Sequence, residues 1–375
     1  MSSTRRIIPA HRTHLNALLS INQRSAPYDA LSRRSFRRFI DHEQGQCVVL
    51  EVAQPQGWLC VGYAILLYRK ATRLARLYSL AIDPDWQGQG LGSELMAYVE
   101  NHARNTYSLF LRLEVNANDN GSLAFCSGRG YKQLGLKAAY FDDASDALVL
   151  QKQLHFFDSS DVPQLVPYLT QSTEFTCGPA SLLMALAHFG HPVPHPEFEE
   201  LEIWREATTI YMTSGHGGCG PHGLARAAHK RGLNVELWVS QSGPVMLDSV
   251  RNEAKRKVME RIQNADIHAL AQSGVAVHIE DYSLEQLRAH LAEGCVVITL
   301  ISTYQFDQTK APHWVVVTAA DEEFVYINDP DDDLLPWQTQ TERQYLPVPC
   351  ETFLRAFGYG SSRLRTALVL SADKA

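Results

Sequence analysis

The feature that most constrains the fold is a glycine-rich turn between an apolar strand and a helix. The strand is expected to end at Ile82-Asp-Pro, glycines follow at positions 88, 90 and 92, and a helix is expected over 93–104. Glycine lets a ligand approach the backbone closely, and the free N–H groups at a helix start suit a phosphate. This order predicts an α/β or α+β sheet domain. The glycines indicate either a phosphate site or a plain turn.

The chain length and the pattern along it indicate two domains. With 375 residues, two cores are expected. Helical periodicity over 5–39 precedes strand patterns over 47–70 and 75–82. A stretch over about 154–171, which contains Asp158-Ser-Ser-Asp and two prolines, comes before a strong helix at 179–189. We therefore expect domains at 1–153 and 154–375. Further helices are expected near 223–231, 248–264 and 284–293, and further strands at 295–301, 313–318 and 324–328.

Composition excludes several functional classes. The net charge is −7 and the basic clusters are short, so no nucleic-acid partner is expected. The apolar runs are shorter than the roughly 18 residues of a spanning helix, so no membrane partner is expected. Seven cysteines without a Cys-x-x-Cys pair predict no disulfide framework and a cytoplasmic protein. His216, Cys219 and His222 lack a second ligand cluster, so no metal site is expected. The oligomeric state is not predicted.

The glycine turn also carries a family resemblance. Gln87-x-x-Gly90-x-Gly92 resembles the Gln/Arg-x-x-Gly-x-Gly/Ala signature of the GNAT acetyltransferases. Further similar segments follow the family in order and spacing over about residues 45–150: Ala81-Ile-Asp-Pro84, Leu113-Glu-Val, Asp119, Leu123-Ala-Phe125 and Gly130-Tyr131.

This resemblance implies a mixed-sheet domain that uses acetyl-CoA as a co-substrate. Backbone N–H groups of the turn would hold the pyrophosphate, and the strand before it would pair with the pantetheine arm. A primary amine of a peptide or protein would attack the thioester directly. The residues that the resemblance assigns to the cofactor are Leu80, Ala81, Ile82, Gln87, Gly88, Gln89, Gly90, Leu91, Gly92 and Asp119.

Three residues of this domain carry open alternatives. Asp119 stands where the family usually has an asparagine that contacts CoA, and Cys126 stands where it usually has a tyrosine. Cys126 is a candidate acid for the leaving thiolate, or a small buried side chain. Glu114 is a candidate base for the incoming amine, or a strand residue that faces solvent.

A second chemical motif begins at Cys177. Gly178-Pro179 and an apolar helix follow this cysteine directly, and proline is favoured in a first helical turn. The helix dipole favours a thiolate at that position, as a cysteine nucleophile requires. Gln171, six residues earlier, is able to place its side-chain amide beside the Cys177 N–H group. Two such donors make an oxyanion hole.

The partner histidine is predicted to be His313. It opens a strand that is followed by a turn and a second strand ending at Asn328-Asp-Pro. A turn centred on Asp321 places His313 opposite Asp329, with Cβ atoms about 5 Å apart. Asp329 would then hold the imidazole ring as the third member of a triad. A register shift of one residue would bring Asn328 or Pro330 opposite instead.

These residues resemble the papain-like peptidases that process bacteriocin leader peptides, over roughly residues 165–335. The resemblance implies that Cys177 is the nucleophile, His313 the general base and acid, Asp329 the orienting residue and Gln171 the oxyanion donor. The chain is therefore interpreted as a bifunctional enzyme, an N-acetyltransferase followed by a cysteine peptidase, which acts on peptides or proteins. Two alternatives remain: the second domain is a thiol-dependent amidase or acyl or peptidyl transferase, or the first is a CoA-binding recognition module without turnover.

Overall fold

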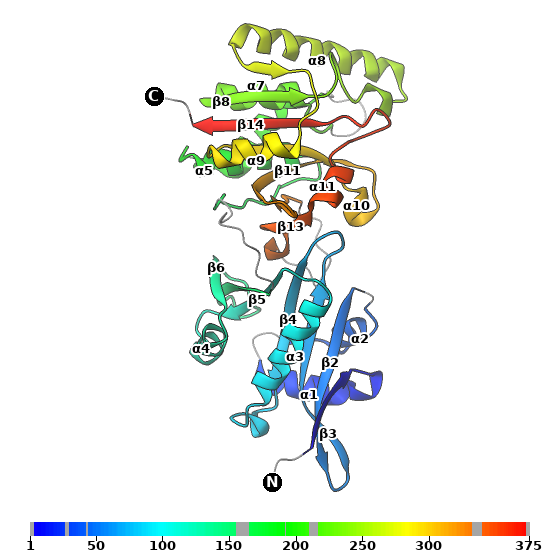
Figure 1. The fold of residues 1–375 in the computed structure, drawn as a ribbon, viewed down its shortest axis with the longest axis vertical. Coiled ribbons are helices and arrows are strands. Elements are labelled where there is room, and N and C mark those ends of the chain that lie inside the picture. The colour runs from blue at the N-terminus through cyan, green and yellow to red at the C-terminus, as the bar shows by residue number, and fades with distance from the viewer. Residues whose placement is uncertain are drawn as a thin grey trace. The chain divides into compact units, whose positions relative to one another are not determined.

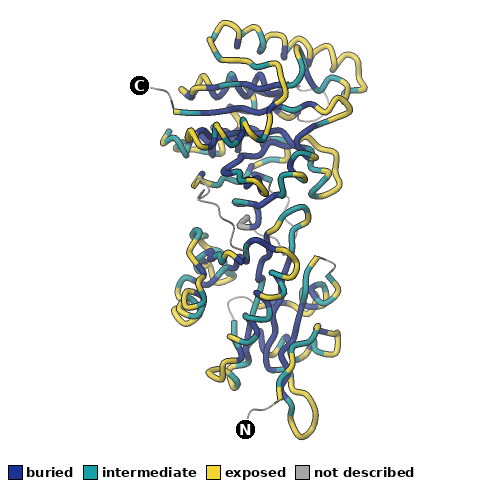
Figure 2. The backbone as a smooth tube through the Cα atoms, viewed as in Figure 1, coloured by how far each residue is buried: buried dark blue, intermediate teal, exposed yellow. Residues whose placement is uncertain are grey.

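The computed structural model describes residues 4–26, 30–42, 44–154, 165–191, 193–209, 217–331 and 340–372. The chain forms two compact units, Met1–Asp158 and Ser159–Ala375, each built on its own sheet (Figure 1). The predicted domain boundary after residue 153 stays a prediction, because residues 155–164 lie outside the described residues. Figure 2 shows the central strands of each sheet as buried. None of the helices in the described part of the chain is long and apolar enough to cross a bilayer.

The first unit is a mixed sheet with the strand order β1-β2-β3-β4-β5-β7-β6. Adjacent strands of this sheet are antiparallel, except for β4 and β5, which are parallel. The strands are β1 (Arg5–Pro9), β2 (Gly45–Gln54), β3 (Gly57–Tyr68), β4 (Leu74–Ile82), β5 (Phe110–Asn116), β6 (Lys132–Lys137) and β7 (Ala147–Gln153). The helices are η1 (Arg12–His14), α1 (Leu15–Ser25), α2 (Arg33–Ile40), η2 (Pro84–Trp86), α3 (Leu91–Asn105) and α4 (Asn120–Gly128).

The expectation of helical structure throughout 5–39 is wrong at its start. Residues Arg5–Pro9 form the edge strand β1, in which Ile7 lies opposite Leu50 of β2. Pairing with a long neighbouring strand outweighs helical periodicity over so short a stretch. Proline is tolerated there because an edge strand leaves one side without a ladder partner. The expected helices begin after this strand, as α1 and α2.

The parallel strands β4 and β5 pair only where they begin. Their ladder joins Leu74–Arg76 to Phe110–Arg112. Strand β4 then continues to Ile82, paired with β3 along its length. The edge of residues 77–82 that faces β5 therefore lies beyond the described ladder. The backbone groups of such an edge are able to pair with another extended chain.

The second unit is a sheet with the strand order β13-β12-β11-β10-β14-β8-β9, antiparallel except for β8 and β9. Its strands are β8 (Leu233–Val239), β9 (Ala276–His278), β10 (Val296–Ser302), β11 (Pro312–Ala320), β12 (Phe324–Asn328), β13 (Leu346–Pro349) and β14 (Thr366–Ala372). Its helices are α5 (Cys177–His188), α6 (Pro196–Ala207), α7 (Pro221–Lys230), η3 (Leu247–Ser249), α8 (Glu253–Ser273), α9 (Leu284–Ala292), α10 (Tyr304–Asp307), η4 (Gln340–Arg343) and α11 (Cys350–Ala356).

Alternate residues of the central strands build the main core of this unit. Val296, Ile298 and Leu300 of β10 belong to the cluster that also contains the apolar side of α5 and α7. Helix α5 lies against β11, helix α7 against β8, and helix α9 against β10 and β11. The α5 helix is apolar all round and is buried through residue 186, as expected for a helix in the middle of a domain.

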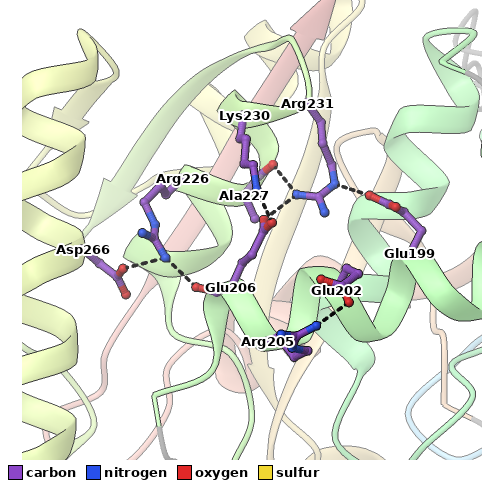
Figure 3. A network of polar contacts seen from close by, with 9 residues as sticks. All are labelled: Glu199, Glu202, Arg205, Glu206, Arg226, Ala227, Lys230, Arg231 and Asp266. Atoms are coloured by element: carbon purple, nitrogen blue, oxygen red, sulfur yellow. Dashed lines mark hydrogen bonds and ion pairs between the residues drawn. The ribbon is translucent and has the colours of Figure 1, made fainter.

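Ion pairs join helices α6, α7 and α8 at the surface (Figure 3). The Arg231 guanidinium bonds to Glu199, at 2.6 Å, and to Glu206, at 2.8 Å, so that it ties α6 to the end of α7. Arg226 pairs with Asp266 of α8 at 3.2 Å. The side chains of Arg231 and Asp266 are only 13% and 5% exposed, so these pairs are partly shielded from water. They fix the arrangement of the three helices.

Candidate functional site

Cys177 is the first residue of α5, and its side chain is largely buried. The N–H groups of a first helical turn have no partner inside the helix, and the dipole there favours an anion. The next position accepts only glycine easily, because a Cβ atom at Gly178 would lie 3.1 Å from Cδ1 of Trp314 and 3.4 Å from Cβ of Cys219. Trp314 is held in turn by a 3.1 Å bond from its Nε1 to the Cys219 carbonyl. The backbone that follows Cys177 is thus closely packed against Trp314 and Cys219.

His313 lies between Cys177 and Asp329. Its Nε2 atom is 2.7 Å from Oδ1 of Asp329, and both side chains are buried. Burial opposes a charge on the ring, but the charge and hydrogen bond of Asp329, together with a hydrogen bond and charge interaction with Cys177, outweigh it and raise the pKa of His313 well above its usual value. Because Asp329 occupies Nε2, Nδ1 is the ring nitrogen left for the thiol.

The strand register that led to this pair differs from the expected one. Val316 lies opposite Asn328 and Val317 opposite Ile327, with an irregularity before Ala319. The turn spans Asp321–Phe324, because the Asp321 carboxylate accepts the N–H groups of Glu323 and Phe324. Extended by this register, His313 would face position 331 instead of 329. A shift of two residues keeps the same side of the strand, so Asp329 becomes a diagonal neighbour whose side chain still reaches the ring.

Sequence reasoning missed Arg343, which holds the far side of Asp329. Its Nη1 atom donates to Oδ2 of Asp329 at 2.9 Å and also bonds to Asp331. Its carbonyl accepts the Asp329 N–H at 2.8 Å. Burial lowers the pKa of Arg343, but the two carboxylates more than compensate and raise it. Asp329 is therefore clamped between two cationic groups, and no local sequence signal marks the arginine fourteen residues away.

Gln171 is buried beside the same strand end. The backbone N–H of Gln171 donates to the Pro330 carbonyl at 2.8 Å, and the Tyr168 hydroxyl donates to the Asp329 carbonyl at 3.0 Å. These bonds fasten the segment before α5 to the end of β12. The structure thus brings the predicted residues of the second unit to one place, while the oxyanion role of the Gln171 amide stays a prediction.

The end of the glycine loop before α7 lies close to Cys177. Cys219 interacts electrostatically with Cys177, and burial, followed by that interaction, raises the Cys219 pKa well above its usual value. Burial lowers the pKa of His222 to about 4. His216 lies outside the described residues. Within the described ranges, no three His, Cys, Asp or Glu side chains gather as a metal site, and none of the seven cysteines is in a disulfide.

The glycine turn of the first unit ends at the N-terminus of α3. Gly88 and Gly90 have φ angles of 75° and 78°, which side-chain-bearing residues avoid, and Gly90 is the residue before the helix. The Gln87 amide donates to the Ile82 carbonyl at 3.1 Å and so folds the turn back onto β4. Gly92 lies in the first helical turn. Leu80–Ile82 thus lie at the end of β4, beyond its described ladder with β5, and Gln87–Gly92 lead from the turn into the start of α3.

Glu114 on β5 lies in a buried ion pair. Its carboxylate accepts bonds of 2.9 Å from Nε and Nη2 of Arg76, and the two side chains are only 3% and 4% exposed. Arg76 also donates to the Tyr140 hydroxyl at 2.9 Å. The alternative that Glu114 faces solvent is therefore wrong. Its role as a base stays a prediction, and that role requires the amine to reach a carboxylate that already holds an arginine.

Asp119 precedes helix α4 as its N-cap residue, and Cys126 lies within the helix. The Asp119 carboxylate caps this helix by accepting the Ser122 N–H at 3.0 Å and the Ser122 hydroxyl at 2.7 Å. Cys126 belongs to the apolar core, and burial raises the pKa of its thiol to about 11. The thiol is therefore protonated at neutral pH, as both the acid and the buried-side-chain interpretations require.

Comparison with known proteins gives two family matches. Residues 166–371 match the model described as "Peptidase_C39 like family". Residues 15–131 match the model of the acetyltransferase (GNAT) family. The predicted fold class, a GNAT mixed sheet followed by a second α/β domain of the peptidase type, is confirmed.

Curated relatives cover part of the first unit only. The [ribosomal protein bS18]-alanine N-acetyltransferases of Escherichia coli K12 and Salmonella typhimurium are 29% and 28% identical over 79 residues, 20% of this chain. The chain spans about half the length of these relatives, 53%. Among solved structures, the ribosomal-protein-S18-alanine N-acetyltransferase from Escherichia coli is 23% identical with a TM-score of 0.37, covering 42% of this chain and 99% of its own. A putative acetyltransferase from Salmonella typhimurium, with its cofactor acetyl-CoA, is 15% identical with a TM-score of 0.35, covering 42% and 98%.

Proposed function

The chain belongs to the Peptidase_C39 like family and carries a GNAT acetyltransferase domain, and from this premise we propose a bifunctional enzyme. The second unit would be a cysteine peptidase with Cys177 as nucleophile. The first unit would transfer the acetyl group of acetyl-CoA to a primary amine of a peptide or protein. The observation that carries the peptidase proposal is the buried contact of His313 with Asp329 at 2.7 Å, beside a cysteine at a helix N-terminus.

The proposed peptidase reaction follows from the positions of these groups. The thiol proton moves to Nδ1 of His313, and the Cys177 sulfur attacks the peptide carbonyl carbon. The Cys177 N–H and the Gln171 amide would stabilise the oxyanion. The C–N bond then breaks, the amine leaves with the proton from His313, and a thioester remains. Water, deprotonated by His313, hydrolyses the thioester and restores the thiol. Asp329 would keep Nε2 protonated throughout, and Arg343 would hold the far oxygen of Asp329 in place.

A transferase or amidase using the same thiol remains the second candidate for this unit. The thioester is common to all three reactions. Water attacks it in a peptidase and in an amidase, which differ in the amine that leaves, whereas a second amine attacks it in a transferase. Mass analysis of products in ¹⁸O water separates hydrolysis from transfer, and the identity of the released amine separates a peptidase from an amidase. Hydrolysis of a peptide incorporates the label into the new carboxylate, whereas transfer joins a second amine and incorporates none.

The first unit supports acetyl transfer through its open strand edge and glycine turn. The edge of β4 over Leu80–Ile82 suits the pantetheine amides, and the α3 N-terminus suits the pyrophosphate. The bound cofactor supplies an acetyl thioester. A primary amine would attack it, and the protonated Cys126 is a candidate to supply a proton to the departing thiolate. The alternative, a CoA-binding recognition module, predicts acetyl-CoA binding without thiol release across a panel of amines.

The two activities would act in sequence on one substrate. Peptide cleavage exposes a new α-amine, which is the group that an N-acetyltransferase modifies. The curated relatives of the first unit described above are named as acetyltransferases of an alanine in a ribosomal protein. If the peptidase product is never acetylated when acetyl-CoA is present, this coupling is refuted.

Thiol reactivity tests the peptidase proposal directly. The full chain is treated with limiting iodoacetamide at mildly acidic pH, and labelled peptides are read by mass spectrometry. We expect selective labelling of Cys177 that collapses in His313→Ala and survives in His268→Ala, a surface histidine that bonds only to Gln272 in the described structure. Cys177 labelling no faster than that of the other six cysteines would overturn the proposal.

A further inference from the structure

A cavity of about 540 Å³ lies at the end of the sheet that carries His313. Two of the residues that line it flank this histidine. Ser302 pairs with Pro312, in the ladder position next to the pair of Ile301 and His313. Lys310 lies two residues before β11 begins. The cavity therefore belongs to the same sheet end as the proposed triad.

The charge of this cavity is of one sign. Of the described residues that line it, Lys310, Arg355 and Arg363 are cationic and none is acidic. Arg355 also bonds to Glu351 at 2.8 Å, which leaves Lys310 and Arg363 as the main cationic groups. Lys310 lies 5.6 Å from the centre of the Tyr304 ring, another residue of the wall. Concave, singly charged surfaces concentrate ligands of the opposite charge.

Arg363 lies in a strained turn at the wall of this cavity. Its φ angle is 50°, in the left-handed region, within a loop closed by the pairing of Tyr359 with Leu364. Its Nη2 atom donates to the Leu354 carbonyl at 3.4 Å. A Cβ atom at Gly358 would lie 3.0 Å from this Nη2 atom, so the guanidinium packs against the backbone of Gly358, in space that a side chain there would occupy. A cation fixed before binding loses less entropy when a ligand arrives, and strain of this kind gathers at binding sites.

A neighbouring cavity of about 420 Å³ gives a useful contrast. It shares the turn at 359–361, but Asp248 and Arg256 both line it, and their side chains approach to 3.8 Å. Its charges offset each other. The preference for an anion is therefore a property of the first cavity and not of this whole end of the molecule.

We propose that the cationic cavity binds an acidic segment of the peptide or protein that is cleaved at Cys177. This inference rests on the proposed peptidase function and names the class of its substrate: chains with carboxylates a short distance from the scissile bond. A substrate held at the His313 end of β11 passes the Lys310 side of the sheet. Its carboxylates would then pair with Lys310 and with the fixed guanidinium of Arg363.

The test uses the full chain carrying Cys177→Ala, so that no turnover occurs. Fluorescence anisotropy compares a fluorescein-labelled hexaglutamate peptide with a hexaglutamine peptide of the same length. We expect the acidic peptide to bind at least about tenfold more tightly at low salt, and to weaken as sodium chloride is added. Adding Lys310→Gln and Arg363→Gln should remove the difference. The matched control removes two exposed cations of the same unit, Arg205→Gln and Lys257→Gln, and should keep it.

Three results would overturn the cavity proposal: equal binding of the two peptides, an equal loss in the control variant, or an oligonucleotide of equal charge that binds more tightly through Lys310 and Arg363. Iodoacetamide labelling separates this proposal from the peptidase proposal. It is done on two proteins that keep Cys177, the native chain and the variant carrying Lys310→Gln and Arg363→Gln. Selective labelling without a preference for the acidic peptide refutes the cavity alone. Unselective labelling refutes the peptidase proposal, and with it the identification of the acidic peptide as a substrate.

Discussion

Replacing Asp329 with asparagine removes the charge that supports His313 and keeps the shape of the side chain. In the native protein the carboxylate lies 2.7 Å from Nε2, and its charge and hydrogen bond raise the His313 pKa against the effect of burial. Two unit charges about 4 Å apart interact by about 4 kcal/mol at an effective dielectric constant of 20. Neighbouring opposite charges typically change an ionisation by about 1.4–4 kcal/mol. The proposed thiolate–imidazolium pair of Cys177 and His313 should lose stabilisation of that size.

The assay is the rate of Cys177 labelling by iodoacetamide at pH 5 and at pH 9. Because the reagent attacks thiolates, the Asp329→Asn rate at pH 5 should fall by about 10- to 1000-fold. At pH 9 an ordinary thiol is largely ionised without help, so the two proteins should differ by less than about threefold. Asp331→Asn is the matched control, because Asp331 shares Arg343 with Asp329. An unchanged rate at pH 5 would refute the reasoning, and an equal fall at both pH values would show that the substitution damages the structure instead.

Three further predictions concern stability. Gly90→Ala should lower the free energy of unfolding by about 1–2 kcal/mol, because its φ of 78° disfavours a side chain. Gly128→Ala, at a helical position with free space around it, should change the free energy of unfolding by less. Urea unfolding midpoints compare the two variants, and equal effects would contradict this prediction. Arg343→Met should lower the free energy of unfolding by about 3–5 kcal/mol, because it leaves the Asp329 carboxylate buried without its arginine. A decrease below about 1 kcal/mol in urea unfolding would contradict this prediction. His222 is neutral when folded because burial lowers its pKa to about 4. Its contribution of about 3 kcal/mol to the free energy of unfolding is therefore present above pH 6.5 and lost as the pH falls toward 4. In His222→Gln, the urea unfolding midpoint should depend less on pH over this range.

The parts of the fold that were predictable are those with local signals. The turn before α3 was evident because only glycine takes the φ angles at 88 and 90 easily, and α5 because apolar residues follow Gly178-Pro179. The closeness of His313 and Asp329 was also predicted, and the structure places them 2.7 Å apart. The register behind that prediction was wrong by two residues, since the side chain of Asp321 decides where the turn forms.

The parts that escaped prediction depend on contacts between distant residues. Arg343 reaches Asp329 only after β13 has joined the sheet beside β12. The burial of Glu114 depends on Arg76, 38 residues earlier, on the neighbouring parallel strand. Edge strand β1 forms because β2 offers it a partner, which the helical periodicity of 5–39 does not reveal. Side-chain pattern reports which face is apolar, but it does not report which strand becomes the neighbour.

The position of β14 has a consequence for the order in which the protein is made. Residues Thr366–Ala372 lie between β10 and β8, in the interior of the second sheet. Domains generally fold as units during synthesis, beginning with the N-terminal one. The first unit is therefore able to complete its sheet while the ribosome is still adding residues, whereas the second unit lacks an inner strand until residue 372 has left the exit tunnel. A nascent chain would then carry a finished first sheet well before it carries a complete second sheet.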